Sequence, residues 1–149
     1  MENLVYYLPV LAIIGFIFIG WKTIWVNKQP SGEKKMQQIA QHIREGAMAF
    51  LKAEYKYLAI FVVAVAGLLF FKSTTEADSN GFVVVSFITG ALFSGLAGFI
   101  GLSIATRANV RTTQAARSSL KKALAIAFSA GSVMGLGVVS LGVFGLSAL

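Results

Sequence analysis

The sequence predicts an all-α membrane protein with four transmembrane helices, the second of which extends into the cytoplasm as an amphipathic helix. Hydrophobic residues make up 56% of the chain and charged residues 13%, whereas a soluble domain carries about 25% charged residues. The mean hydropathy is +0.75, and lysines and arginines gather beside long apolar runs. At this length we expect a single bundle over residues 1–149. Its spans are predicted at about 4–25, 50–71, 81–106 and 123–149, with cytoplasmic loops at about 26–49 and 107–122.

The first predicted span, 4–25, has Pro9 in its early turns and Trp21 and Trp25 at its far end. Tryptophan is enriched at membrane interfaces. A cleaved signal peptide is the alternative interpretation. It fits less well, because the sequence begins MEN instead of with basic residues and no small-residue cleavage site follows. We therefore expect a helix of the mature protein.

An amphipathic helix is predicted before the second span. Residues 28–30 interrupt the apolar pattern, and Ser31 is expected to cap a new helix with Glu33 in its first turn. Apolar side chains then recur at helical spacing, at Met36, Ile39, Ile43, Ala47, Phe50 and Leu51. Such a helix can lie in the membrane interface or pack on another part of the protein.

The second span continues this amphipathic segment without a break. The apolar run 57–71 would be only about 22 Å long at 1.5 Å per residue, whereas the hydrocarbon core of a bilayer is about 30 Å thick. The span must therefore begin earlier, near residues 47–53. Because no proline separates the two parts, we expect one long helix that projects from the membrane at its start.

Small side chains recur every fourth residue in the third and fourth spans. The third has one stripe of Ser86, Gly90, Ser94 and Gly98 and a second of Ala97, Gly101 and Ala105, and the fourth has Ala123, Ala127, Gly131 and Gly135. In lipid, small residues let helix backbones approach closely. We interpret the stripes as packing surfaces, directed at each other or at helices outside this chain. A glycine-lined ion path is the less favoured alternative.

The charges between the spans predict the side of the membrane on which each loop lies. Seven basic residues and three acids lie between Lys22 and Lys56, and five basic residues without an acid lie between Arg107 and Lys122. The turn at 72–80 has one lysine and two acids. Because loops rich in lysine and arginine stay in the cytoplasm, we expect both basic loops there and both chain ends outside.

The sequence predicts no catalytic, cofactor-binding or metal-binding residue. Cysteine is absent, which excludes thiolate chemistry. His42, the single histidine, is interpreted as a polar-face residue. Glu54 lies near the second span, and an ion pair with Lys52, Lys56 or a neighbouring helix is favoured over a role in a proton or sodium relay. The net charge of +7 indicates topology and contact with the lipid bilayer, and no nucleic-acid partner is expected.

Three stretches together resemble the membrane-bound, ion-translocating inorganic pyrophosphatases. The run GEKKMQQIAQHIREGAMAFLKAEYKYLAI is similar to their first cytoplasmic loop and second helix, where a segment of the type M-x-x-I-A-x-x-I-x-E-G-A-x-A-[FY]-L-x-x-[QE]-Y-K recurs. GFIGLSIATRANVRTTQAAR resembles the end of their third helix and the following loop. SLKKALAIAFSAGSVMGLGVVSLGVFGL resembles their fourth helix. The matches occur in family order and cover nearly the whole chain from Gly32.

The resemblance implies a polytopic, homodimeric pump of a prokaryotic cell membrane that couples hydrolysis of inorganic pyrophosphate to export of protons or sodium. Members require Mg²⁺, and potassium stimulates some of them. Both termini of the family lie outside, as the loop charges also predict. The family binds magnesium and pyrophosphate through aspartate-rich motifs, whereas Asp78 is the single aspartate here and lies on the predicted external side. We therefore expect an N-terminal four-helix portion that packs against the remaining helices of the pump and is itself inactive.

Two alternatives stay open beside this expectation. One is a stand-alone four-helix membrane scaffold or partner-binding protein without enzymatic activity. The other is a lipid-interacting protein that uses the basic amphipathic helix. A reading frame that continues past Leu149 into aspartate-rich motifs would separate the first expectation from both alternatives.

Overall fold

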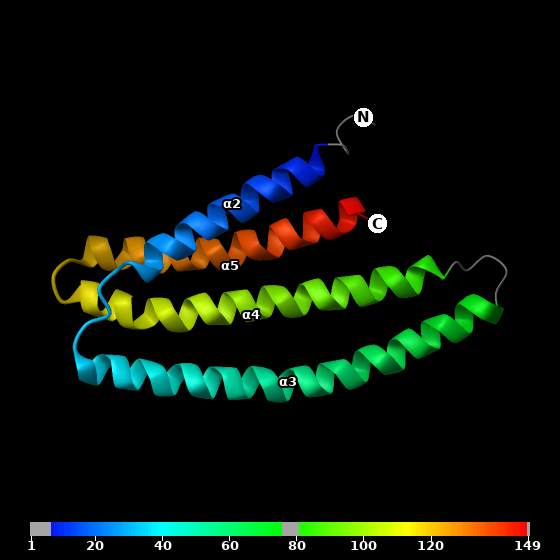
Figure 1. Cartoon of the computed structure of the whole chain (residues 1–149), viewed down its shortest axis with the longest axis horizontal. Helices are drawn as coiled ribbons and strands as arrows, with labels where there is room; N and C mark the ends of the chain where they lie inside the picture. The colour runs from blue at the N-terminus through cyan, green and yellow to red at the C-terminus, as the bar shows by residue number, and fades with distance from the viewer. Residues whose placement is uncertain (1–6, 76–80, 149) are drawn as a thin grey trace.

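Four long helices make up the computed structural model, which describes residues 7–75 and 81–148 (Figure 1). They are α2 (Leu8–Asn27), α3 (Lys34–Thr75), α4 (Phe82–Ala116) and α5 (Leu120–Ala148). Each is long and apolar enough to cross a membrane, and the described residues contain no strand. A helix satisfies its backbone hydrogen bonds internally, which lipid requires of a spanning segment. The predicted all-α membrane fold with four spanning helices is confirmed.

α3 is one continuous helix of 42 residues, as predicted from the lack of a break. At 1.5 Å per residue it is about 63 Å long, roughly twice the thickness of a hydrocarbon core. The expectation that Ser31 caps this helix was wrong. The helix begins at Lys34, and the carbonyl of Glu33 accepts the first helical hydrogen bond, from the Gln37 N–H at 3.0 Å. The reason is Gly32, whose φ of +78° turns the chain just before the helix.

Consecutive helices run in opposite directions, so the connections alternate between the two ends of the bundle (Figure 1). α5 lies between α2 and α4, and α3 lies on the other side of α4. The α2–α3 and α4–α5 connections are at one end, which we call the basic end because most lysines and arginines lie near it. The start of α2 and the end of α5 are at the opposite end.

The apolar core lies at the basic end, where α2, α4 and α5 converge. Its buried members are Val26, Ile104, Ala108, Ile126, Ala130 and Val133. α4 is helical well past Thr106, so that most of the predicted 107–122 loop forms the last turns of α4 and the first turn of α5. Most large apolar side chains on the outer faces of the bundle are exposed, as expected for helices surrounded by lipid or by further helices.

The predicted small-residue stripes divide into a packed and an unpacked set. Ala97 and Gly101 of α4 and Ala123 of α5 are buried. At Gly101 a Cβ would lie 2.9 Å from Cγ of Met134 in α5, so glycine permits this close approach of the two helices. Exposed members of the stripes are Gly90, Ser94, Gly98, Ala127, Gly131 and Gly135. Packing against α5 is therefore confirmed for one stripe of α4, and a partner for the exposed positions stays a prediction.

A hydrogen bond joins α3 to α4 within the apolar region. The Tyr55 hydroxyl donates to the carbonyl of Gly95. One turn further on, a Cβ on Gly98 would lie 3.4 Å from the same hydroxyl oxygen. Small residues of α4 therefore leave room for the tyrosine, and its hydroxyl finds an acceptor in a region without water.

Candidate functional site

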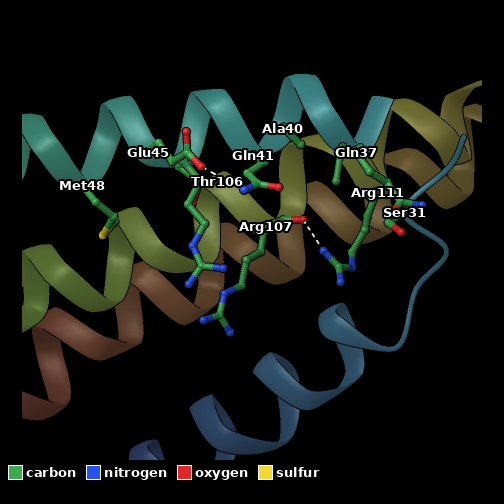
Figure 2. Close-up of a pocket in the computed structure, with 11 residues that line it drawn as sticks. Ser31, Gln37, Ala40, Gln41, Glu45, Met48, Thr106, Arg107 and Arg111 are labelled. Atoms are coloured by element: carbon green, nitrogen blue, oxygen red, sulfur yellow. Dashed lines mark hydrogen bonds between the residues drawn. The ribbon is translucent and has the colours of Figure 1, made fainter. Parts of the chain in front are cut away.

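An open cavity of about 530 Å³ lies between α3 and α4 at the basic end (Figure 2). Two groups of polar side chains line it, one from each helix. The members that carry charge or amide groups are Gln37, Gln41, Arg44, Glu45, Arg107 and Arg111. We call this the arginine cavity.

Helical spacing brings these side chains together. Arg107 and Arg111 are four residues apart on α4 and therefore share one face of that helix, and Figure 2 shows both side chains leaving α4 on the same side. Gln37, Gln41 and Arg44 are spaced by four and three residues on α3, so they also form one stripe. Because α3 lies beside α4 over this length, the two stripes face a common space.

Arg111 connects α4 to the end of α2. Its Nη2 donates to the carbonyl of Asn27 at 3.1 Å, and its Nε donates to the carbonyl of Gln29 at 3.2 Å. Its Nη1 donates to the carbonyl of Arg107 at 2.7 Å (Figure 2). The last carbonyls of a helix have no partner within that helix and carry partial negative charge. The guanidinium therefore satisfies the C-terminal end of α2 and stabilises its contact with α4.

The positive charges and the N–H donors of the two α4 arginines are only partly balanced by neighbouring groups in the described part of the chain. Burial lowers the pKa of Arg111, which lies beyond the apolar span, and the nearby charge of Arg107 lowers it further. The Nε of Arg107 is buried and has no hydrogen-bond partner in the described part of the chain. A buried donor without a partner is costly in free energy, because it has lost its hydrogen bonds to water. This position is the least satisfied point of the cavity wall.

Glu45 is the one carboxylate in the cavity wall, and its oxygens are already engaged on α3. Gln41 Nε2 donates to its Oε1 at 2.9 Å, and His42 Nδ1 lies 3.5 Å from its Oε2. The cavity is therefore lined by three guanidinium groups and one carboxylate. The formal charges of these four side chains therefore sum to +2.

An ion pair joins the two connections at the basic end. Arg117, which follows α4, forms an ion pair with Glu33 at the start of α3. The hydrogen bond and the charge of Arg117 lower the pKa of the Glu33 carboxyl. Beside this pair, a Cβ on Gly32 would lie 2.8 Å from Sδ of Met36 and 2.9 Å from Oε1 of Gln114. The positive φ at position 32 therefore favours glycine, and a larger residue would also displace the ends of the Met36 and Gln114 side chains.

The described residues do not fit a magnesium site. They contain no group of three histidine, cysteine, aspartate or glutamate side chains that could hold a metal ion. Glu54 is exposed, and the described residues give it no ion pair, so the predicted pairing with Lys52 or Lys56 is not seen. Asp78 lies outside the described residues. No step of hydrolysis can be derived from the acids whose positions are known.

The arginine cavity was not found from the sequence. The charge pattern assigned Arg107 and Arg111 to topology alone, and Arg44 had no assigned role. The spacing of Arg107 and Arg111 is a signal for a shared helix face. Nothing in the sequence, however, shows that Arg44 faces them, because that depends on how α3 is rotated against α4. His42, considered and set aside, lies outside the cavity with an exposed side chain.

Comparison with known proteins identifies the family. The family model described as inorganic H+ pyrophosphatase matches residues 13–149. A Clostridium tetani protein, provisionally named a K(+)-stimulated pyrophosphate-energized sodium pump, is 46% identical over 137 residues, which are 91% of this chain and 19% of that protein. A Methanosarcina mazei protein named a K(+)-insensitive pyrophosphate-energized proton pump is 38% identical over 149 residues, which are 100% of this chain and 22% of that protein.

A third relative extends the agreement to another organism. The K(+)-insensitive pyrophosphate-energized proton pump 2 of Moorella thermoacetica is 41% identical over 142 residues, 95% of this chain and 20% of that protein. No solved structure gives a significant match. The chain spans about a fifth of the length of these relatives. With four apolar helices and a family match over nearly all of its residues, this chain belongs to the inorganic H+ pyrophosphatase family of membrane proteins.

Proposed function

We propose that this chain forms a four-helix portion of a pump that couples pyrophosphate hydrolysis to the transport of protons or sodium across a membrane. The observation that carries the proposal is the family match over residues 13–149. It is supported by relatives named as proton pumps and as sodium pumps, each matched along most of this chain. Because the relatives include both proton pumps and sodium pumps by name, the proposal covers either ion.

The role of the portion itself is structural in this proposal. Helices α2, α4 and α5 share an apolar core, and α3 joins them through α4. The acids in the described residues do not converge on a metal, which supports hydrolysis by residues outside this chain. Magnesium, and potassium where it stimulates, would then be bound by those other residues.

The remaining helices of the pump are the proposed partners of an exposed surface between α4 and α5. A cavity of about 480 Å³ there is lined by exposed small residues of α4, among them Gly90, Ser94 and Gly98, and by Val138 and Gly142 of α5. In lipid, small residues at a helix surface favour close packing of another helix. A second copy in a homodimer is proposed from the family resemblance and not from this surface.

The proposed orientation places the basic end in the cytoplasm of a prokaryotic cell, and the start of α2 and the end of α5 outside. It is supported by the even number of candidate spans within residues 7–75 and 81–148 and by the basic residues around both connections at one end. Lysine and arginine beside spanning helices favour retention in the cytoplasm.

A chimera tests the proposed function. In it, this chain replaces the matched segment of the Clostridium tetani protein, and the chimera is purified in vesicles beside the parent protein. We expect magnesium-dependent pyrophosphate hydrolysis and ion uptake into the vesicles by the chimera, and no hydrolysis above the vesicle background by this chain alone. A chimera that inserts normally but neither hydrolyses pyrophosphate nor moves ions would contradict membership in the working pump. Hydrolysis by the chain alone would contradict the structural role.

A further inference from the structure

We infer that the arginine cavity binds a phosphate group, presented by an anionic phospholipid or by a soluble phosphate anion. The inference does not depend on the proposed pump function. It starts from the charge of the cavity, where Arg44, Arg107 and Arg111 face a single carboxylate. Like charges four residues apart on a helix repel each other, and a bound anion would remove this repulsion.

The state of each donor favours an anion over water alone. Arg111 uses Nε and one hydrogen on each terminal nitrogen for backbone carbonyls, so two of its five N–H groups stay available. Arg107 has a buried Nε without a partner in the described part of the chain. Arginine binds phosphate oxygens through two parallel N–H groups. The two terminal nitrogens of Arg107, a residue that lines the cavity, are one such pair of donors.

The wall also offers neutral groups, and its one carboxylate is held away from the arginines. Gln37 and Gln41 contribute amides and Ser31 a hydroxyl. Oε1 of Glu45 accepts a hydrogen bond from Gln41, which lowers the competition of this carboxylate for the guanidinium groups. A cavity with this composition binds a small oxyanion more readily than a cation or an apolar ligand.

The position of the cavity is the level at which a lipid headgroup lies. On α4 the apolar run ends at Thr106, directly before Arg107, and on α3 the cavity wall ends at Met48, close to the start of the predicted span. Basic pockets between transmembrane helices at this level bind the headgroups of anionic lipids. A phospholipid can therefore place its acyl chains beside the spans and its phosphate in the cavity.

Binding of a tail-labelled phosphatidylglycerol to the full chain in dodecyl maltoside micelles, followed by fluorescence anisotropy, tests the inference. We expect Arg107→Gln to weaken binding about tenfold, because a hydrogen-bonded charged donor is lost. Lys121→Gln, which removes the same charge from an exposed side chain outside the cavity, should change binding less than about twofold. Equal losses in the two variants, or no loss in Arg107→Gln, would overturn the inference.

Two further arms identify the source of the phosphate and guard against misfolding. Sodium phosphate and sodium pyrophosphate are added at ionic strength matched with sodium chloride. If these salts displace the lipid more than sodium chloride does, the cavity binds a soluble phosphate anion. If they do not, the phosphate that the cavity binds is that of the lipid headgroup. Ala40→Glu places a carboxylate in the wall and leaves every arginine unchanged. It should weaken binding like Arg107→Gln at unchanged helicity by circular dichroism, and wild-type binding by Ala40→Glu would refute the cavity as the site.

Discussion

Gly101→Ala and Gly131→Ala make the same chemical change on two packed helices, yet we expect opposite effects on stability. A Cβ on Gly101 would lie 2.9 Å from Cγ of Met134 and 3.3 Å from its Sδ and Cε. Carbon atoms in favourable contact are about 3.5–4.0 Å apart, so Met134 must move by several tenths of an ångström. At Gly131 nothing lies within 4 Å of the added atom.

The magnitudes follow from two opposing terms. Replacing glycine by alanine inside a helix stabilises it by about 0.5–1 kcal/mol. Overpacking of a well-packed interface costs about 1–3 kcal/mol. Gly101→Ala should therefore destabilise the chain by about 1 kcal/mol, and Gly131→Ala should stabilise it by about 0.5–1 kcal/mol.

Equilibrium unfolding by sodium dodecyl sulfate in mixed micelles, followed by tryptophan fluorescence, measures both effects. Trp25 packs against the core and reports its loss. A double variant with Met134→Ala removes the obstacle, and because Met134 is 49% exposed this second change alone should cost little. The double variant should recover the stability lost in Gly101→Ala. Equal shifts for Gly101→Ala and Gly131→Ala, or no recovery in the double variant, would refute the packing argument.

Three further predictions concern the contacts at the basic end and the orientation of the helices in the membrane. Arg111→Met should destabilise the chain by about 2–3 kcal/mol in the same unfolding assay, because the carbonyls of Asn27, at the end of α2, and of Gln29, just after it, lose a charged donor. A variant as stable as wild type would contradict the connecting role. In the chain without cysteine, Ser118→Cys should react with a membrane-impermeant maleimide only after cell lysis and Thr75→Cys before it, and the reverse pattern would invert the topology. The Glu33–Arg117 pair lowers the Glu33 pKa below its ordinary value of 4.5. Its contribution to stability is therefore complete above pH 4.5 and is lost as the pH falls through the lower folded pKa, a loss that Glu33→Gln should abolish in a pH series of unfolding midpoints.

The composition and the positions of the charges were enough to predict four long helices, but not where each of them begins and ends. Lipid provides no hydrogen bonds to the backbone, so an apolar run of sufficient length must be helical wherever it packs. The absence of proline between the amphipathic segment and the second span likewise predicted the single helix α3. The start of α3 was misplaced, because the left-handed conformation of Gly32 overrides the capping preference of Ser31.

The sequence by itself therefore determined the four-helix membrane fold and the family, because these depend on local chemistry and on the order of residues along the chain. Only the tertiary structure decided which faces meet. It buries Ala97 and Gly101 and leaves Gly98 exposed, and it brings Arg44 of α3 to the same cavity as two arginines of α4. The physical reason is that small residues permit close packing on any face of a helix, and the rotation of each helix is set by contacts with residues far away in the chain.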